Sequence, residues 1–180
     1  DIICTAKGLS SGYIPIGAMI FSDRIWAAMA EDGGRWFTSG FTYSGHPVAC
    51  AVALENIRVF KAEKIIDKVA KETAPYLAKK FHSLADHPIV GVTETCGMMA
   101  GLVLAKDKAK KTGFDPAAEV GMMCRGYCFK EGVIMRAVGD RMIIAPPLII
   151  SKAEIDTMIA LIHRCLDLTW EEVKRLDLLA

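Results

Sequence analysis

The chain has 180 residues, of which 52% are hydrophobic, and its 22 lysines and arginines nearly balance 21 aspartates and glutamates, for a net charge of +1. It can bury a substantial core, and without a basic stripe interleaved with aromatic residues it lacks the electrostatic footprint of a nucleic-acid-binding protein. Charged residues or prolines interrupt every apolar run before the roughly 20 residues that a bilayer requires, and no signal peptide is evident, so no membrane segment is expected.

The first segment, DIICTAKGLSSGYIPIGA, combines a strand pattern with a lysine. Residues 2–4 predict a short buried strand, and YIPIGAMIF predicts a second one. Lys7 ends the first strand and enters a loop of small residues, at the rim of a sheet where ligands commonly bind. A desolvated lysine amine loses its proton readily and can form a Schiff base. The alternative is an ordinary solvated lysine.

Helical patterns follow the two strands. DRIWAAMAE predicts a short helix capped by Ser22 and Asp23, and residues 31–40 have the composition of an exposed loop. A long helical pattern covers residues 47–84. Its first half is apolar almost all round and is expected to be buried, whereas its second half is amphipathic. This change predicts a domain boundary near Arg58, between domains of residues 1–57 and 58–180.

The remaining residues alternate between strands and helices. IVGVTETCGMMAGLVLA predicts two or three antiparallel strands, and a charged connection leads to a helix closed by Gly132. Residues 133–150 predict a strand, a Gly-Asp turn and a second strand. Ser151 and Glu154 form a capping box for a last helix that runs to about Leu176. The expected fold class is α/β.

The six cysteines form no CxxC pair. Cys124 and Cys128 are one helical turn apart and could supply half of a metal site, but the chain offers no matching histidine pair. We therefore expect no metal, and we interpret the cysteines as buried, reduced thiols of a cytoplasmic protein.

Two other segments carry candidate binding residues. In GFTYSGHP, the Thr42 hydroxyl and the backbone N–H groups of the turn could hold a phosphate, or Thr42, Ser44 and His46 could simply cap the next helix. In VIMRAVGD, Arg136 could form a surface ion pair with Asp140, which would contribute little. Alternatively, its planar guanidinium could bind a carboxylate through two hydrogen bonds.

Taken together, these segments resemble the class III pyridoxal-phosphate (PLP) aminotransferases, a fold type I family. DIICTAKGLSSGYIPIGAMI is similar to the family's lysine segment, and GFTYSGHPVACAVALENI, GLVLA, KEGVIMRAVGD and RMIIAPPLIISKAEID follow in the family's order. The resemblance implies the end of a large PLP-binding domain at residues 1–57 and a small α+β C-terminal domain at residues 58–180. Family members are more than twice as long, so we expect a C-terminal part, with the residues that contact the pyridine ring upstream of Asp1.

The resemblance also implies roles for individual residues. Lys7 would bind PLP as a Schiff base and, once released, shuttle a proton. Thr42 would reach the cofactor phosphate of the partner subunit of a homodimer with shared active sites, and Phe41 would line the same edge, mainly through its backbone. Arg136 would bind the substrate carboxylate. Ile143 stands where the ornithine-type branch has an arginine, which favours this role for Arg136.

The implied function is transfer of an amino group from an ω-amino acid, amine or diamine to the keto acid pyruvate by a ping-pong mechanism. The alternatives are an aminomutase, an epimerase or a decarboxylase on the same scaffold. A non-catalytic fragment that lacks the N-terminal half of the site is a further alternative.

Overall fold

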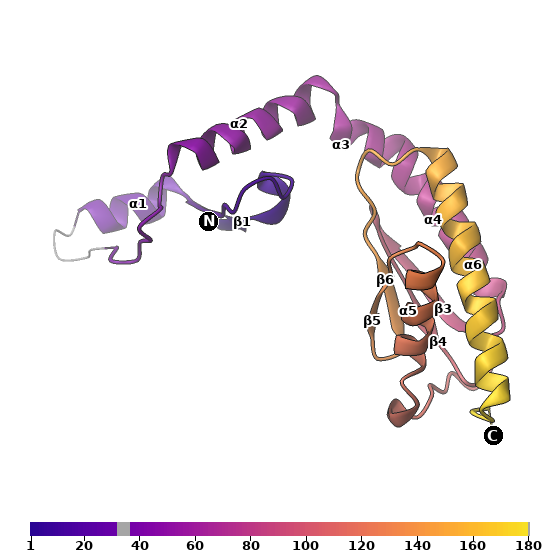
Figure 1. The fold of residues 1–180 in the computed structure, drawn as a ribbon. Coiled ribbons are helices and arrows are strands. Elements are labelled where there is room, and N and C mark those ends of the chain that lie inside the picture. The colour runs from indigo at the N-terminus through magenta and orange to yellow at the C-terminus, as the bar shows by residue number, and fades with distance from the viewer. Residues whose placement is uncertain (32–36, 180) are drawn as a thin grey trace. The chain divides into compact units, whose positions relative to one another are not determined.

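The structure, a computed structural model, describes residues 1–31 and 37–179 (Figure 1). The chain divides into two compact units, Asp1–Lys64 and Ile65–Ala180. The sequence places the boundary seven residues earlier, after residue 57. The units separate at Lys64, where a left-handed backbone (φ 51°) interrupts the helical path. Of the loop predicted over residues 31–40, residues 32–36 lie outside the described residues.

In the described residues, the first unit contains a two-stranded ribbon, a 3₁₀ turn and two α-helices. Strands β1 (Ile2–Thr5) and β2 (Ala18–Phe21) pair antiparallel, and helices α1 (Asp23–Ala30) and α2 (Pro47–Ala62) follow. The predicted strand at residues 2–4 is confirmed, but its predicted burial is wrong. Ile2 and Ile3 are 58% and 63% exposed, because β2 is the only strand paired with β1 in the described residues.

Helix α2 is also more exposed than its composition predicts. Only Ala49 and Ala53 are buried, and Val48 and Leu54 lie in solvent. An apolar sequence makes burial favourable, but burial requires a second surface against the helix. No described residue supplies that surface for the outer side of α2.

The second unit begins with a helical path in three parts. These are α3 (Ile65–Lys68), a π-helical turn (Val69–Thr73) and α4 (Ala74–His82). In the π turn, the Ala74 N–H donates to the carbonyl oxygen of Val69, five residues back, just before Pro75. Pro75 has no N–H to donate, so a local change of helical register is tolerated there. The single helix predicted over residues 47–84 is therefore wrong.

The sheet of the second unit has four antiparallel strands in the order β3-β4-β6-β5. The strands are β3 (Val90–Cys96), β4 (Met99–Leu104), β5 (Arg136–Val138) and β6 (Arg141–Ile144). They confirm the predicted hairpins. Alternate residues of β4 are buried, and those between them lie on the opposite face of the sheet.

Helices cover one face of this sheet. Helices α5 (Val120–Lys130) and α6 (Lys152–Arg175) pack together with α4 around the core (Figure 1). The predicted capping box of α6 is confirmed, since the Glu154 N–H donates to the Ser151 Oγ (3.2 Å) and the Ser151 N–H donates to Glu154 Oε2 (2.8 Å). The largest fully buried core side chains include Phe81, Leu77, Leu102, Met142, Ile155, Ile162 and Leu166.

All six cysteines are free thiols, but only half of them are buried. Cys124, Cys128 and Cys165 lie in the core, whereas the predicted burial of Cys4, Cys50 and Cys96 is wrong. Within residues 1–31 and 37–179, no group of three or more His, Cys, Asp or Glu residues is placed to hold a metal ion. No helix in the same residues is long and apolar enough to cross a membrane.

Candidate active site

Lys7 lies two residues after the end of β1, at the start of a 3₁₀ turn (Lys7–Leu9). Its backbone is left-handed (φ 48°), and its side chain is exposed. Within the described part of the chain, its Nζ has no hydrogen bond or ion pair. The amine is therefore accessible to a ligand, but the described residues do not supply the desolvation that the strand-end position suggested.

The loop after Lys7 is fixed by one residue of α2. The Asn56 Nδ2 donates to the carbonyl oxygens of Gly8 (2.9 Å) and Leu9 (3.1 Å), and the Ser11 hydroxyl donates to Asn56 Oδ1 (2.7 Å). Asn56 was not among the residues that the sequence pattern singled out. The available signal was a lone amide, next to Glu55, near the end of the mainly apolar segment VACAVALENI.

Of the three polar residues that the sequence proposed as caps, only His46 caps α2 in the described residues. His46 is the N-cap, and its Nδ1 accepts from the Ala49 N–H (3.4 Å). The Ser44 hydroxyl accepts from the Phe41 N–H (3.0 Å). The Thr42 hydroxyl is exposed and makes no hydrogen bond in the described residues, so it is not a cap.

Phe41 contributes its backbone to the turn and leaves its ring in solvent. Its N–H is occupied by Ser44, its carbonyl oxygen accepts from the Ser44 N–H (2.9 Å), and its side chain is 87% exposed. The Phe41 backbone therefore stabilises the turn before α2 through two hydrogen bonds with Ser44.

Arg136 lies on β5, exposed and directly paired with Ile143 of β6. The ion pair with Asp140 is not formed, and Asp140 Oδ2 instead accepts from the Phe114 N–H (3.2 Å). No other ion pair or hydrogen bond of the Arg136 side chain occurs in the described residues. The guanidinium is therefore available to an external carboxylate.

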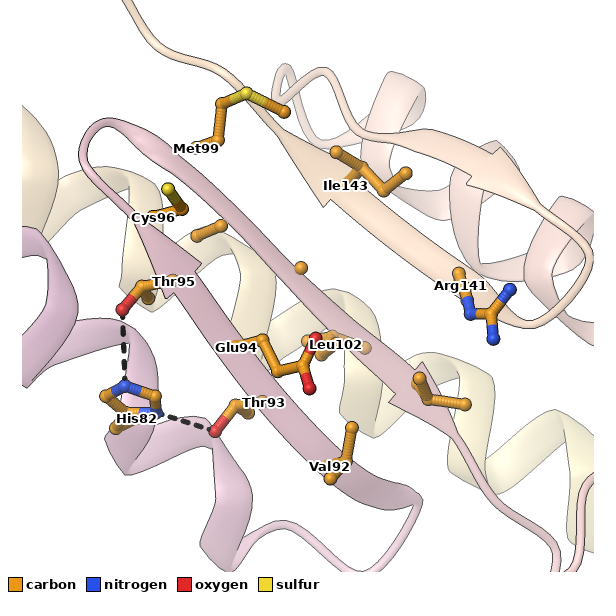
Figure 2. Close-up of a pocket in the computed structure, with 13 residues that line it drawn as sticks. His82, Val92, Thr93, Glu94, Thr95, Cys96, Met99, Leu102, Arg141 and Ile143 are labelled. Carbon is orange, nitrogen blue, oxygen red and sulfur yellow. Dashed lines mark hydrogen bonds between the residues drawn. The ribbon is translucent and has the colours of Figure 1, made fainter.

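The open face of the sheet holds a hollow of about 570 Å³ in the second unit. Figure 2 shows Glu94 on β3, Met99 on β4, and Arg141 and Ile143 on β6 around it. Glu94, Gly101, Ile143 and Arg136 form one row across the four strands. Glu94 and Arg136 are at the two ends of this row, three strand spacings or about 14 Å of backbone apart, so their side chains do not form an ion pair. The sequence did not predict this hollow.

The candidate residues fall into two groups. The first unit brings the Lys7 loop against α2, whose N-terminal turn carries Thr42, and Arg136 belongs to the second unit. The exposed amine fits an aldehyde, and the turn ahead of the helix N-terminus, whose Thr42 hydroxyl has no partner in the described residues, separately fits a phosphate. A free guanidinium fits a substrate carboxylate.

Comparisons with known proteins agree with this chemistry. Residues 1–166 match the model of the family Aminotransferase class-III. The chain is 54% identical over 169 residues to the putrescine–pyruvate aminotransferase of Pseudomonas aeruginosa, covering 94% of this chain and 36% of that relative. The chain therefore spans little more than a third of the length of that curated relative.

Two solved structures share the fold over nearly the whole chain. A thermostable (S)-enantioselective omega-transaminase from Thermomicrobium roseum matches with a TM-score of 0.88 and 38% identity, over 94% of this chain and 37% of that one. The PMP-bound form of an aminotransferase from Vibrio fluvialis matches with a TM-score of 0.88 and 34% identity, over 96% of this chain and 38% of that one.

Proposed function

The chain belongs to the class III aminotransferases, PLP-dependent enzymes of the α/β fold type I, and from this premise we propose that its protein transfers an amino group from an ω-amino acid or a diamine to pyruvate. The observation that carries the proposal is the Lys7 amine, which lies two residues after β1, is exposed and has no partner in the described residues. The choice of donor and acceptor is supported by the 54% identity to a putrescine–pyruvate aminotransferase.

Lys7 has two tasks in this proposal. Its Nζ would hold PLP covalently at rest and, once an amine substrate has displaced it, would act as the base that accepts the proton of the substrate carbon and gives it back. When bound, PLP supplies an electron sink for the charge that develops on the substrate carbon. Because the freed amine stays attached to its loop, it remains near both carbons without a separate base.

In this proposal, Thr42 binds the phosphate of the cofactor and Arg136 binds the carboxylate of the substrate. The Thr42 hydroxyl, which makes no hydrogen bond in the described residues, would donate to the phosphate of the cofactor held by the other subunit of a homodimer, and Phe41 keeps the turn in shape through its hydrogen bonds to Ser44. The Arg136 guanidinium binds the carboxylate of pyruvate or of an amino acid through two parallel hydrogen bonds. A cytoplasmic location is part of the proposal, supported by the six free thiols.

Covalent labelling tests the assignment of Lys7. The full-length protein is loaded with PLP, reduced with borohydride, digested and analysed by mass spectrometry, with Lys61→Ala as the matched control for an exposed lysine of the same unit. We expect the label on Lys7 in the wild type and in the control, and none on that peptide in Lys7→Ala. A label on another lysine would contradict the assignment.

Product analysis tests the reaction. With putrescine or β-alanine as the donor, alanine should accumulate from pyruvate over many turnovers, and Lys7→Ala should abolish it. Release of carbon dioxide, or isomerisation without a keto acid, would instead support a decarboxylase, a mutase or an epimerase. A protein that takes up no PLP would support the non-catalytic alternative.

A further inference from the structure

We infer that Asn56 is a positioning residue that holds the Lys7 loop in its binding conformation from helix α2. This inference rests on the proposed role of Lys7 as the cofactor-binding lysine. Asn56 lies 49 residues after Lys7 in the sequence, and the hydrogen bonds from its side-chain amide reach the loop directly after the lysine.

The chemistry of the three hydrogen bonds fixes the orientation of the amide. The carbonyl oxygens of Gly8 and Leu9 can only accept, so the Nδ2 of Asn56 must face them. The Oδ1 is then left to accept from the Ser11 hydroxyl. Three of the four hydrogen-bonding positions of the amide are spent on this one loop.

The loop needs such a restraint because its backbone is strained. Lys7 (φ 48°) and Ser11 (φ 50°) are both left-handed, a conformation that residues with a Cβ avoid. Strain of this kind persists where the surrounding structure holds it in place. The backbone hydrogen bonds of the loop, from the N–H groups of residues 9–11 and 13, span only three residues each, and those to the Lys7 and Gly8 oxygens are long, at 3.2 and 3.4 Å. The Ser10 hydroxyl adds a bond to the Ile14 carbonyl oxygen (2.7 Å), which also stays within the segment between β1 and β2. Among the hydrogen bonds of the described residues, those with Asn56 attach the loop to a different element.

The same helix links the lysine to the candidate phosphate turn. His46 caps the N-terminus of α2, and Asn56 lies ten residues further on, about 15 Å along the axis. Both belong to the first unit. A shift of α2 would therefore move the Thr42 turn and the Lys7 loop together, and Asn56 is the residue that transmits it.

Few side chains can replace Asn56. An aspartate has the same shape but would place a carboxylate oxygen against two carbonyl oxygens, whereas alanine removes all three bonds. Ser11→Ala removes only the bond to Oδ1 and leaves both carbonyl contacts. These variants form a graded series, and Glu55→Ala is the matched control, because Glu55 is the preceding residue of α2 and pairs only with Arg58 in the described residues.

Hydrogen exchange of the full-length protein without PLP tests the restraint directly. We expect the amides of residues 9–13 to exchange at least tenfold faster in Asn56→Ala and Asn56→Asp than in the wild type, with a smaller increase in Ser11→Ala and none in Glu55→Ala. Unchanged exchange in Ser11→Ala and both Asn56 variants would overturn the inference. If the Asn56 variants fail to fold, Ser11→Ala decides the inference: faster exchange than in Glu55→Ala supports it, and unchanged exchange overturns it.

The PLP-loaded protein separates positioning from general structural support. We expect Asn56→Ala to shift the midpoint of the pH titration of the visible absorbance of the lysine-bound cofactor and to lower kcat at least tenfold, with the KM for pyruvate changed less than twofold. Asn56→Gln should recover part of the loss. A normal titration midpoint and kcat in Asn56→Ala would overturn the positioning role. If exchange accelerates as expected but borohydride labels another lysine, the proposed function fails while the restraint on the loop stands.

Discussion

Arg136 on β5 and Ile143 on β6 are directly opposite each other, on the face of the sheet that points away from the core. An isoleucine can cover the methylene stem of an arginine but cannot neutralise its charge. The pairing therefore leaves the guanidinium free while fixing its position along the sheet. The Arg136–Ile143 pairing therefore supports the proposal that Arg136 recognises a carboxylate.

Removal of the guanidinium should impair the keto acid half-reaction selectively. We expect Arg136→Ala to lower kcat/KM for pyruvate by about 10- to 100-fold, which corresponds to about 1.5–3 kcal/mol for hydrogen bonds to a charged group. Arg136→Lys should recover only part of the lost kcat/KM, because an ammonium lacks the two parallel N–H donors of a planar guanidinium. Stopped-flow measurement of each half-reaction checks this, with putrescine as the donor without a carboxylate and Arg141→Ala as the control. Equal losses with pyruvate and putrescine would mean that Arg136 is structural.

An arginine at position 143 should repel Arg136 across the strands. Like charges directly opposite each other are destabilising, so we expect Ile143→Arg to lower the free energy of unfolding by about 0.2–1 kcal/mol beyond the change in Ile143→Met. The difference should shrink in 1 M salt, which screens exposed charges. Urea denaturation at two salt concentrations, repeated in an Arg136→Ala background, measures it. A salt-dependent loss that survives in that background would rule out the pairing as its cause.

The hairpin that carries Arg136 depends on a close approach by α5. A Cβ at Gly121 would lie 2.0 Å from the carbonyl oxygen of Gly139 in the β5–β6 turn, whereas one at Gly126 of the same helix would meet nothing within 4 Å. Gly121→Ala should cost about 1–3 kcal/mol of unfolding free energy and raise the KM for pyruvate. Gly126→Ala should instead gain about 0.5–1 kcal/mol. If Gly121→Ala and Gly126→Ala had the same free energy of unfolding in urea denaturation, the β5–β6 turn would be able to move away from α5 without cost.

Mixed dimers can test whether Thr42 acts across the subunit interface. A heterodimer of Lys7→Ala and Thr42→Ala subunits contains one site with both residues intact if Thr42 serves the partner's cofactor. We therefore expect mixing and refolding the two variants to restore activity above the sum of the separate variants. If Thr42 serves its own subunit, every mixed site carries one defect, and no recovery should occur. Mixing Lys7→Ala with Lys61→Ala is the control for losses during refolding, because its activity should equal the sum of the separate variants.

His87 should make the second unit sensitive to acid. Burial lowers its pKa below the ordinary value near 6.5, even though the Asp167 carboxylate opposes this shift, and His163 and Lys108 add to the lowering. Its Nδ1 accepts from the Ile89 N–H (3.3 Å), so its Nε2–H donates to Asp167 (3.1 Å), and a second proton would break the first bond. The unfolded chain thus binds the proton more readily than the folded one, and stability should fall as the pH drops below about 6.5.

Urea denaturation between pH 7.5 and 5.5 checks this expectation. The free energy of unfolding should decrease with acidification in the wild type, and this decrease should be smaller in His87→Gln. His163→Gln is the matched control, because His163 shares Asp167 with His87 but its side chain is half exposed. An unchanged slope in His87→Gln would mean that other groups carry the acid response.

The sequence by itself determined the local elements and the family. The Ser151 capping box, the two strands on either side of the Gly139 turn and the strand before Lys7 were all predicted, because each depends on hydrogen bonds or periodicity within a few residues. The order of the quoted segments also identified the class III resemblance, which the family match confirms.

Only the tertiary structure decided which distant residues meet. Asn56 bonds the Lys7 loop from 47 and 48 positions away, His87 meets Asp167 across 80 positions, and Arg136 faces Ile143 through the register of a sheet. Periodicity indicates which face of a strand is apolar, but the partner opposite each residue depends on how all the strands align. The predicted burial of β1 and α2 was wrong for the same reason. Burial is a property of two surfaces, and a local pattern describes only one of them.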